Sequence, residues 1–188
     1  MNVFAVDDDP YLAAEYMCDK HINKMIIETC QILSCVIDTR SGDSSLSKTL
    51  DLPQYPKAHA KHPCTLWAME TRMNAQWLIK HLHGLEQQFK IRYPRSEHKL
   101  KGTFKTYTLQ LEKCTFDKVD RTPFAQAMPD QYKHEDAITA YRTYYLMEKT
   151  FAVWKKTATP AWYKYGRQQM LAVAVGSLNA FDQHRMVA

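Results

Sequence analysis

The sequence predicts an all-α protein, a single-domain helical bundle of three to five helices with two long polar loops. Apolar residues recur at helical spacing in at least three long segments. Only 5 of the 188 residues are glycine, and no glycine-rich phosphate motif is present, which argues against a Rossmann or P-loop design. A chain of 188 residues is long enough to bury one core. Residues 1–188 are therefore expected to form one helical domain.

The first elements follow from local signals. Residues 1–9 alternate weakly in hydropathy, which predicts a short extended piece. Asp9 followed by Pro10 is typical of a helix start, because the aspartate caps the helix and the proline suits its first position. The best amphipathic helix is expected from Asp19 to about Asp38, where apolar residues recur every three or four positions.

A polar stretch then separates this helix from the next one. Arg40–Lys61 contains serine, glycine and two prolines, and predicts a loop. A second long helix is expected from Cys64 to about Phe89, introduced by His62 and Pro63.

The second half of the chain predicts shorter helices. Residues 94–131 are expected to form a second loop with one short helix near Thr103–Lys113. A third helix is expected over Glu135–Trp154, and a last one over Gln168–Phe181. The residues expected to share a common core are Ile22, Ile26, Leu33, Leu66, Leu78 and Leu82.

Composition limits the functional classes. The formal net charge is +5, a mild excess that is compatible with a polyanionic partner without identifying one. Neither a secretory signal nor a run of about eighteen apolar residues is found, so no membrane association is expected. The five cysteines form no paired motif, which indicates reduced thiols in the cytoplasm.

The eight histidines do not predict a metal site. The groupings considered are Cys18 with His21, His59 with His62 and Cys64, and His81 with His83. None has the paired spacing of a structural zinc site, so no metal and no other cofactor is expected.

The helix that begins at Asp19 carries three reactive side chains on one face. His21 and Glu28 are seven residues apart and point in nearly the same direction, with Lys24 one turn between them. A carboxylate, an imidazole and an ammonium are thus expected on one face, away from the core. The alternative is a solvated face on which Lys24 and Glu28 form an ordinary i,i+4 pair.

A second segment near the C-terminus combines aromatic and basic residues. Trp162, Tyr163 and Tyr165 are interleaved with Lys164 and Arg167. Such a pattern offers stacking surfaces for bases together with partners for phosphates. The alternative is an aromatic cluster that closes the core at a helix start.

These two segments resemble the phage-type pyrimidine-dimer DNA glycosylases, the endonuclease V family. Asp19-x-His21-Ile22 with Glu28 is similar to the first helix of that family, and Pro160-x-Trp-Tyr-Lys-Tyr is similar to its terminal aromatic tail. The segment from Thr65 to Leu82 is similar more weakly, and all three occur in the same order.

The whole chain also resembles a longer set of phage-encoded proteins. The shared stretches are Cys18–Glu28, His62-Pro63-Cys64 and Gln126–Asp130. Residues 39–61 and 95–133 look like insertions relative to the smaller family pattern. If the chain is phage-encoded, its cytoplasmic location is that of the infected host cell.

The resemblance implies a bifunctional glycosylase and abasic-site lyase acting on damaged or modified pyrimidines in double-stranded DNA, with no obligate protein partner. An amine attacks C1′ and forms a Schiff base, and a carboxylate assists. Glu28 matches that carboxylate, and His21 matches a residue lining the site. Residues expected to contact DNA are Lys20, Lys24, Arg72, Arg142, Trp162, Tyr163, Lys164, Tyr165 and Arg167.

The nucleophile is the point of departure from the family pattern. The family uses the amine exposed when the initiator methionine is removed before a small residue, but here Asn2 follows Met1. The amine of Met1 itself, the side chain of Lys20 or Lys24, or loss of the amine step are the alternatives. Loss would favour a DNA-base-modifying transferase on the same scaffold, or a DNA-binding protein without catalysis.

Overall fold

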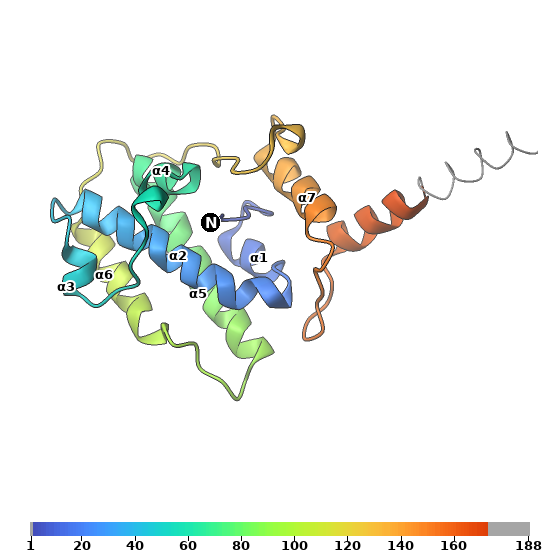
Figure 1. Ribbon diagram of the computed structural model, residues 1–188, viewed down its shortest axis with the longest axis horizontal. Coiled ribbons are helices and arrows are strands. Elements are labelled where there is room, and N and C mark those ends of the chain that lie inside the picture. The colour runs from blue at the N-terminus through green and yellow to red at the C-terminus, as the bar shows by residue number, and fades with distance from the viewer. Residues whose placement is uncertain (1, 173–188) are drawn as a thin grey trace, which may run out of the picture.

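The computed structural model describes residues 2–172, and within that range the protein is helical and contains no strand (Figure 1). This confirms the all-α prediction. The labelled helices are α1 (Pro10–Glu15), α2 (Asp19–Arg40), α3 (Leu46–Thr49), α4 (Pro63–Glu70), α5 (Arg72–Arg92), α6 (Phe104–Lys113) and α7 (Ala137–Glu148). Residues 161–172 are also helical.

The two longest helices, α2 and α5, pack against each other in the middle of the molecule, and α1, α4 and α6 contact them. Ile22, Ile26 and Leu33 of α2 are fully buried, as are Leu78 and Leu82 of α5, so five of the six predicted core residues are confirmed. The sixth, Leu66, was predicted wrongly. It is exposed because the buried side of α4 is formed by its neighbours instead.

The predicted second long helix is two helices. Thr71 has an extended backbone, and its Oγ1 accepts a hydrogen bond from the Asn74 N–H at 3.1 Å, which caps α5. Asn74 Nδ2 in turn donates to the carbonyl of Trp67 at 2.8 Å, near the end of α4. The spacing of apolar residues continues from α4 into α5, so it predicted one helix. The boundary is set instead by Thr71, which ends α4 and caps α5 with its side chain.

The N-terminal segment, for which a short extended piece was predicted, is an irregular stretch that is buried over residues 2–6. Asn2 Oδ1 accepts hydrogen bonds from the backbone N–H groups of Val3 (2.7 Å) and Phe4 (3.0 Å). Phe4 has a positive φ of 49°, a conformation that a non-glycine residue adopts rarely. Ala5 and Val6 are fully buried. The segment is therefore held by packing and by the Asn2 side chain rather than by strand pairing.

The two predicted loops contain more structure than expected. The first contains α3 and a 3-10 turn over Lys57–Lys61, and the second contains α6 as predicted. After α6 the chain returns to α5, where the carbonyl of Lys118 accepts from the Arg72 N–H at 3.1 Å.

The C-terminal helices differ from their predicted limits. α7 ends at Glu148 rather than Trp154, because Lys149–Ala152 form a turn closed by a 2.8 Å backbone hydrogen bond. The last helix begins at residue 161, seven residues before the predicted start, while its predicted end at Phe181 lies outside the described residues.

Candidate active site

Glu28 connects the middle of α2 to the N-terminal segment. Its Oε2 accepts a hydrogen bond from the backbone N–H of Asn2 at 3.0 Å, and its Oε1 lies 3.5 Å from Lys24 Nζ. The Glu28 side chain is only 13% exposed, whereas that of Lys24 is 65% exposed. The carboxylate is thus shielded on the side of the N-terminal segment and faces an exposed ammonium on the other.

Asn2 is fixed by contacts from a distant part of the chain. Its Nδ2 donates to the carbonyl of Ala127 at 2.7 Å. Tyr141 of α7 holds that loop, because its hydroxyl donates to the Ala125 carbonyl at 2.6 Å and accepts from the Ala127 N–H at 3.3 Å. From the sequence, Asn2 is noticeable only as the residue after Met1. No local signal shows that it contacts Glu28.

His21 is buried, which corrects the prediction that its face of α2 points away from the core. Its ring stacks on Phe4 with 5.0 Å between ring centroids, and its edge contacts Phe151. The Tyr145 hydroxyl accepts the Cys18 N–H at 3.1 Å and shares a hydrogen bond of 2.7 Å with His21 Nδ1. The polar stripe is covered because the N-terminal segment and α7 pack onto it.

The protonation of His21 follows from this burial. Burial lowers its pKa to about 4, assisted by the positive charges of Lys149, Lys24 and Lys20. The imidazole is therefore neutral near pH 7. His21 positions the N-terminal segment rather than carrying charge.

His62 lies close enough to Glu28 to feel its charge. In the sequence it is recognisable only as the start of a helix. Its Nδ1 accepts the Cys64 N–H at 3.2 Å and caps α4. Burial lowers its pKa, while the negative charge of Glu28 partly offsets that effect. A second neutral imidazole, that of His62, therefore belongs to the surroundings of the Glu28 carboxylate.

Several predicted DNA-contacting residues serve the packing of the protein. Arg142 donates to the Val6 carbonyl at 2.8 Å and pairs with Asp7 at 3.1 Å, which fastens the N-terminal segment to α7. Its guanidinium also lies over the ring of Trp162. Tyr163 is buried and donates to the Lys149 carbonyl at 3.3 Å. For Trp162 and Tyr163 the aromatic-cluster alternative describes the observed packing.

Other predicted DNA-contacting residues lie at the surface. Lys164 and Tyr165 are exposed, and Arg167 is half-buried on the same helix. Lys20, at the start of α2, is exposed too, with its Nζ 4.7 Å from the centre of the Phe151 ring.

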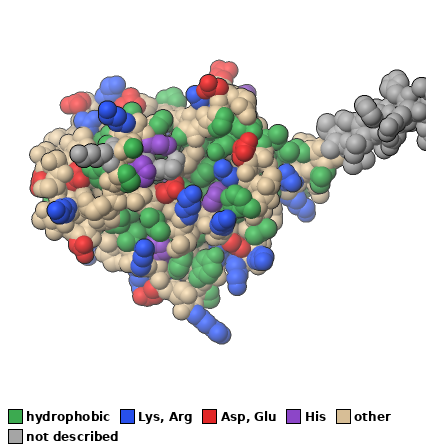
Figure 2. Space-filling view, viewed as in Figure 1, with side chains coloured by type: hydrophobic (Ala, Val, Ile, Leu, Met, Phe, Trp, Pro, Cys, Tyr) green, Lys and Arg blue, Asp and Glu red, His purple; other side chains and the backbone are tan. Residues whose placement is uncertain are grey.

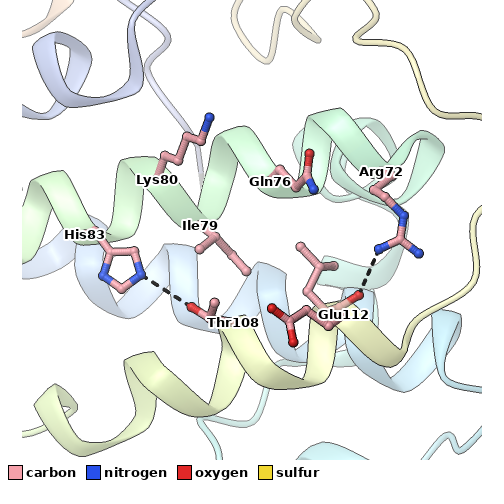
Figure 3. Close-up of a pocket in the computed structure, with 8 residues that line it drawn as sticks. Arg72, Gln76, Ile79, Lys80, His83, Thr108 and Glu112 are labelled. Atoms are coloured by element: carbon pink, nitrogen blue, oxygen red, sulfur yellow. Dashed lines mark hydrogen bonds between the residues drawn. The ribbon is translucent and has the colours of Figure 1, made fainter.

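Arg72 lies in a different environment from Glu28. It donates to the carbonyls of Leu111 (3.3 Å) and Cys114 (2.6 Å), so it fastens the end of α6 to the start of α5. Figure 3 shows it at one end of a cavity of about 350 Å³ between these helices, with His83 and Thr108 at the other end. Asn2, His21, Lys24 and Glu28 do not line this cavity.

The remaining predictions concern surface and composition. Met1 lies outside the described residues. Figure 2 shows Lys and Arg side chains mixed with hydrophobic ones over the half of the molecule that carries α7 and the loop after it.

All five cysteines are buried and free. Within residues 2–172, no three His, Cys, Asp or Glu side chains gather as metal ligands, and no helix is long and apolar enough to cross a membrane.

Comparison with known proteins agrees with the resemblance seen in the sequence. Residues 1–99, more than half of the 188-residue chain, match the family model described as pyrimidine dimer DNA glycosylase. The matched region includes Asn2, His21, Lys24 and Glu28. No curated protein and no solved structure matches the chain. The chain belongs to the pyrimidine dimer DNA glycosylase family.

Proposed function

We propose that this protein is a DNA glycosylase with abasic-site lyase activity, acting on damaged or modified pyrimidines in duplex DNA. The observation that carries the proposal is the 3.0 Å hydrogen bond between the Asn2 backbone nitrogen and Glu28 Oε2. It brings the start of the chain to a shielded carboxylate, which is the pairing that amine-based excision requires. Membership of the family supplies the substrate class, DNA.

The nucleophile in this proposal is the α-amine at the start of the chain. Asn2 follows Met1 where the family pattern has a small residue, so this amine belongs to Met1 if Met1 is retained and to Asn2 if it is removed. If Met1 is removed, the Asn2 nitrogen is a primary amine already at hydrogen-bond distance from a base. An α-amine has an ordinary pKa of about 7.7–8.0, so a useful fraction is unprotonated near neutral pH. Glu28 is the matching acid/base group, since a carboxylate at this distance can accept a proton from the amine.

The chemical sequence follows from these two groups. The amine attacks C1′ of the nucleotide and the base leaves as the bond forms. Opening of the sugar ring gives a Schiff base between C1′ and the amine. Loss of a proton from C2′ to Glu28 then expels the 3′-phosphate and cuts the strand.

Lys24 is the second candidate nucleophile. Its Nζ lies 3.5 Å from Glu28 Oε1, so it meets the same geometric requirement. Lys24 is 65% exposed, whereas the Asn2 nitrogen is held against the shielded Oε2 of Glu28 by contacts with a distant loop, which favours the start of the chain over Lys24. In the proposal Lys24 therefore holds a phosphate, together with Lys20, Lys164 and Arg167.

The decisive experiment uses ultraviolet-irradiated and abasic duplexes with the full-length protein. The N-terminal residue is first identified by mass spectrometry. Cleavage of both duplexes is then measured, and the Schiff base is trapped with borohydride and mapped by mass. We expect cleavage and an adduct on the N-terminal residue. An adduct on Lys24 would assign the role of nucleophile to Lys24. If neither cleavage nor an adduct is found, the glycosylase and lyase proposal is rejected.

A change in base mass without strand cleavage would instead indicate the base-modifying class. Binding without either change would indicate a DNA-binding protein. The same samples therefore separate the three classes considered for this sequence.

A further inference from the structure

The loop after α7, residues 149–156, exposes two apolar side chains. Ala152 and Trp154 are buried, whereas Phe151 and Val153, which flank Ala152, are 43% and 47% exposed. Trp154 packs on Tyr163 with 4.7 Å between ring centroids. Phe151 lies in the turn after α7 and Val153 in the irregular stretch that follows, so two exposed apolar side chains are separated by a single buried residue.

The loop is tied to the start of α2. The Asp19 N–H donates to the Val153 carbonyl at 3.0 Å, and the Lys155 N–H donates to Asp19 Oδ2 at 2.8 Å. The turn at its base is closed by the Ala152 N–H, which donates to the Lys149 carbonyl. Phe151 and Val153 are therefore held in place on both sides rather than hanging from a loose loop.

Positive charge lies beside these two side chains. Lys20 Nζ lies 4.7 Å from the centre of the Phe151 ring, and the exposed Lys155 and Lys156 follow Val153 in the same loop. Among residues 2–172 none of these three lysines forms a salt bridge, and Asp19, the carboxylate that contacts the loop, is paired with Arg92. Lys149 is engaged instead with Tyr144, whose hydroxyl accepts from its Nζ at 3.2 Å. Exposed apolar side chains beside such ammonium groups match a polyanion with apolar surfaces inside, which describes a base-paired duplex.

The position of Phe151 relates it to the candidate active site. Its ring contacts the edge of His21, with 5.5 Å between centroids, and His21 in turn stacks on the ring of Phe4. Phe4 follows Asn2 by two residues, and Asn2 binds Glu28. One imidazole thus separates the exposed ring from the N-terminal segment.

We propose that Phe151, supported by Val153, is an apolar wedge that enters the base stack of the DNA duplex bound at Glu28. The inference rests on the proposed function. Excision requires the target nucleotide to leave the stack, and the remaining gap is stabilised when a side chain fills it. Phenylalanine is among the residues that proteins insert between base steps, and the neighbouring lysines bind the flanking phosphates.

The test uses duplexes that contain a tetrahydrofuran abasic analogue with 2-aminopurine as the neighbouring base. Insertion of a side chain unstacks the neighbour and raises its fluorescence. We compare the parent protein with Phe151→Ala, with the conservative Phe151→Leu, and with Leu109→Ala on α6 as a control of matched exposure (46%). Binding is measured by anisotropy on the same duplexes, and cleavage on irradiated DNA.

We expect Phe151→Ala to abolish the fluorescence rise and to weaken binding by about tenfold to a hundredfold, the range typical of stacking contacts. Phe151→Leu should keep most of both signals, and Leu109→Ala should match the parent. Placing the target opposite a mismatch, where it is already unstacked, should reduce the defect of Phe151→Ala.

Two different results would contradict the proposed role of Phe151, and the measurements distinguish them. If the parent binds and cleaves DNA but Phe151→Ala gives the same fluorescence and affinity, the wedge is wrong while the proposed function stands. If the parent neither binds nor cleaves any of the duplexes, the proposed function fails and the wedge fails with it.

Discussion

Glu28 and Glu86 make the same kind of ion pair, each with a lysine one helical turn away: Lys24 precedes Glu28 by four residues, and Lys90 follows Glu86 by four. Their side chains are also shielded to a similar degree. Glu28 differs because it also accepts the Asn2 N–H, 26 residues away in the chain. Comparing the two glutamates therefore tests the catalytic role proposed for Glu28 against an ordinary helical ion pair.

Glu28→Gln is expected to reduce cleavage of irradiated duplex by about a hundredfold or more, because the amide keeps the size of the side chain and loses its acid/base function. Thermal unfolding should change little, since an i,i+4 pair is worth only a few tenths of a kcal/mol. Glu86→Gln is the matched control and should retain full activity. Equal activity in the two variants would contradict the assignment of Glu28.

His21 gives a prediction about pH. Its pKa falls from 6.5 in the unfolded chain to about 4 in the folded protein, so protonation favours unfolding. Its contribution to stability is complete above pH 6.5 and is lost as the pH falls from 6.5 towards 4. In that window one such histidine changes the free energy of unfolding by about 1.4 kcal/mol per pH unit.

Urea unfolding of the parent and of His21→Gln at several pH values between 7.5 and 4.5 tests this. The glutamine does not titrate, so the slope of stability against pH should be smaller in the variant by about 1.4 kcal/mol per unit. His81, whose pKa burial also lowers to about 4, is present in both proteins and cancels in the comparison. Identical slopes would show that His21 is not a buried neutral imidazole.

At the scale of elements, Asp19 joins α2, α5 and the 149–156 loop. Its Oδ1 pairs with Arg92 at 3.2 Å, and the Arg92 side chain is fully buried. Arg92 also donates to the Met17 and Glu15 carbonyls at the end of α1. The aspartate that begins the Asp-x-His motif therefore has a structural task, which is to neutralise a buried guanidinium and to fix the loop.

Asp19→Ala is expected to lower the free energy of unfolding by about 3 kcal/mol, because it leaves a buried positive charge without its counterion. Hydrogen exchange of the Lys155 N–H should also accelerate, since that group loses its acceptor. Asp117→Ala provides the comparison, because Asp117 pairs with Arg40 at an exposed surface site and should cost less than about 1 kcal/mol. Similar losses in both variants would refute the buried-pair interpretation.

At the scale of the whole molecule, the net charge of +5 predicts that duplex binding weakens with salt. Each phosphate neutralised releases counterions, so log K falls linearly with log salt. Lys164 and Arg167 lie together on the C-terminal helix, and their combined change to alanine should reduce the magnitude of the slope by about 2.

Anisotropy titrations at a series of salt concentrations check this, with Lys105→Ala combined with Lys113→Ala on α6 as the control for net charge. Tyr165→Ala should weaken binding with little change in slope, since the exposed ring offers stacking rather than charge. Trp162 is unsuitable for this purpose, because it packs on Tyr145 and Tyr16 and its loss would affect folding. Unchanged slopes in the double variant would exclude this helix from the DNA interface.

The fold class and the main helices are predictable from the sequence, because helical periodicity and capping are local properties. The limits of α6 were predicted within a residue, and α2 within two, at segments with strong periodicity. The break at Thr71 was missed because the apolar pattern continues through it, and only the Asn74 hydrogen bonds mark the boundary. The shared direction of Lys24 and Glu28 was likewise predictable from spacing along one helix.

Only the tertiary structure decided what this face of α2 meets. Asn2 reaches both Glu28 and Ala127, which are 26 and 125 residues away, and His21 is covered by Phe4 and Tyr145. Spacing within a helix fixes the relative direction of side chains but carries no information about which distant segment packs on them. That packing turns an apparently solvated polar stripe into a shielded carboxylate beside the start of the chain.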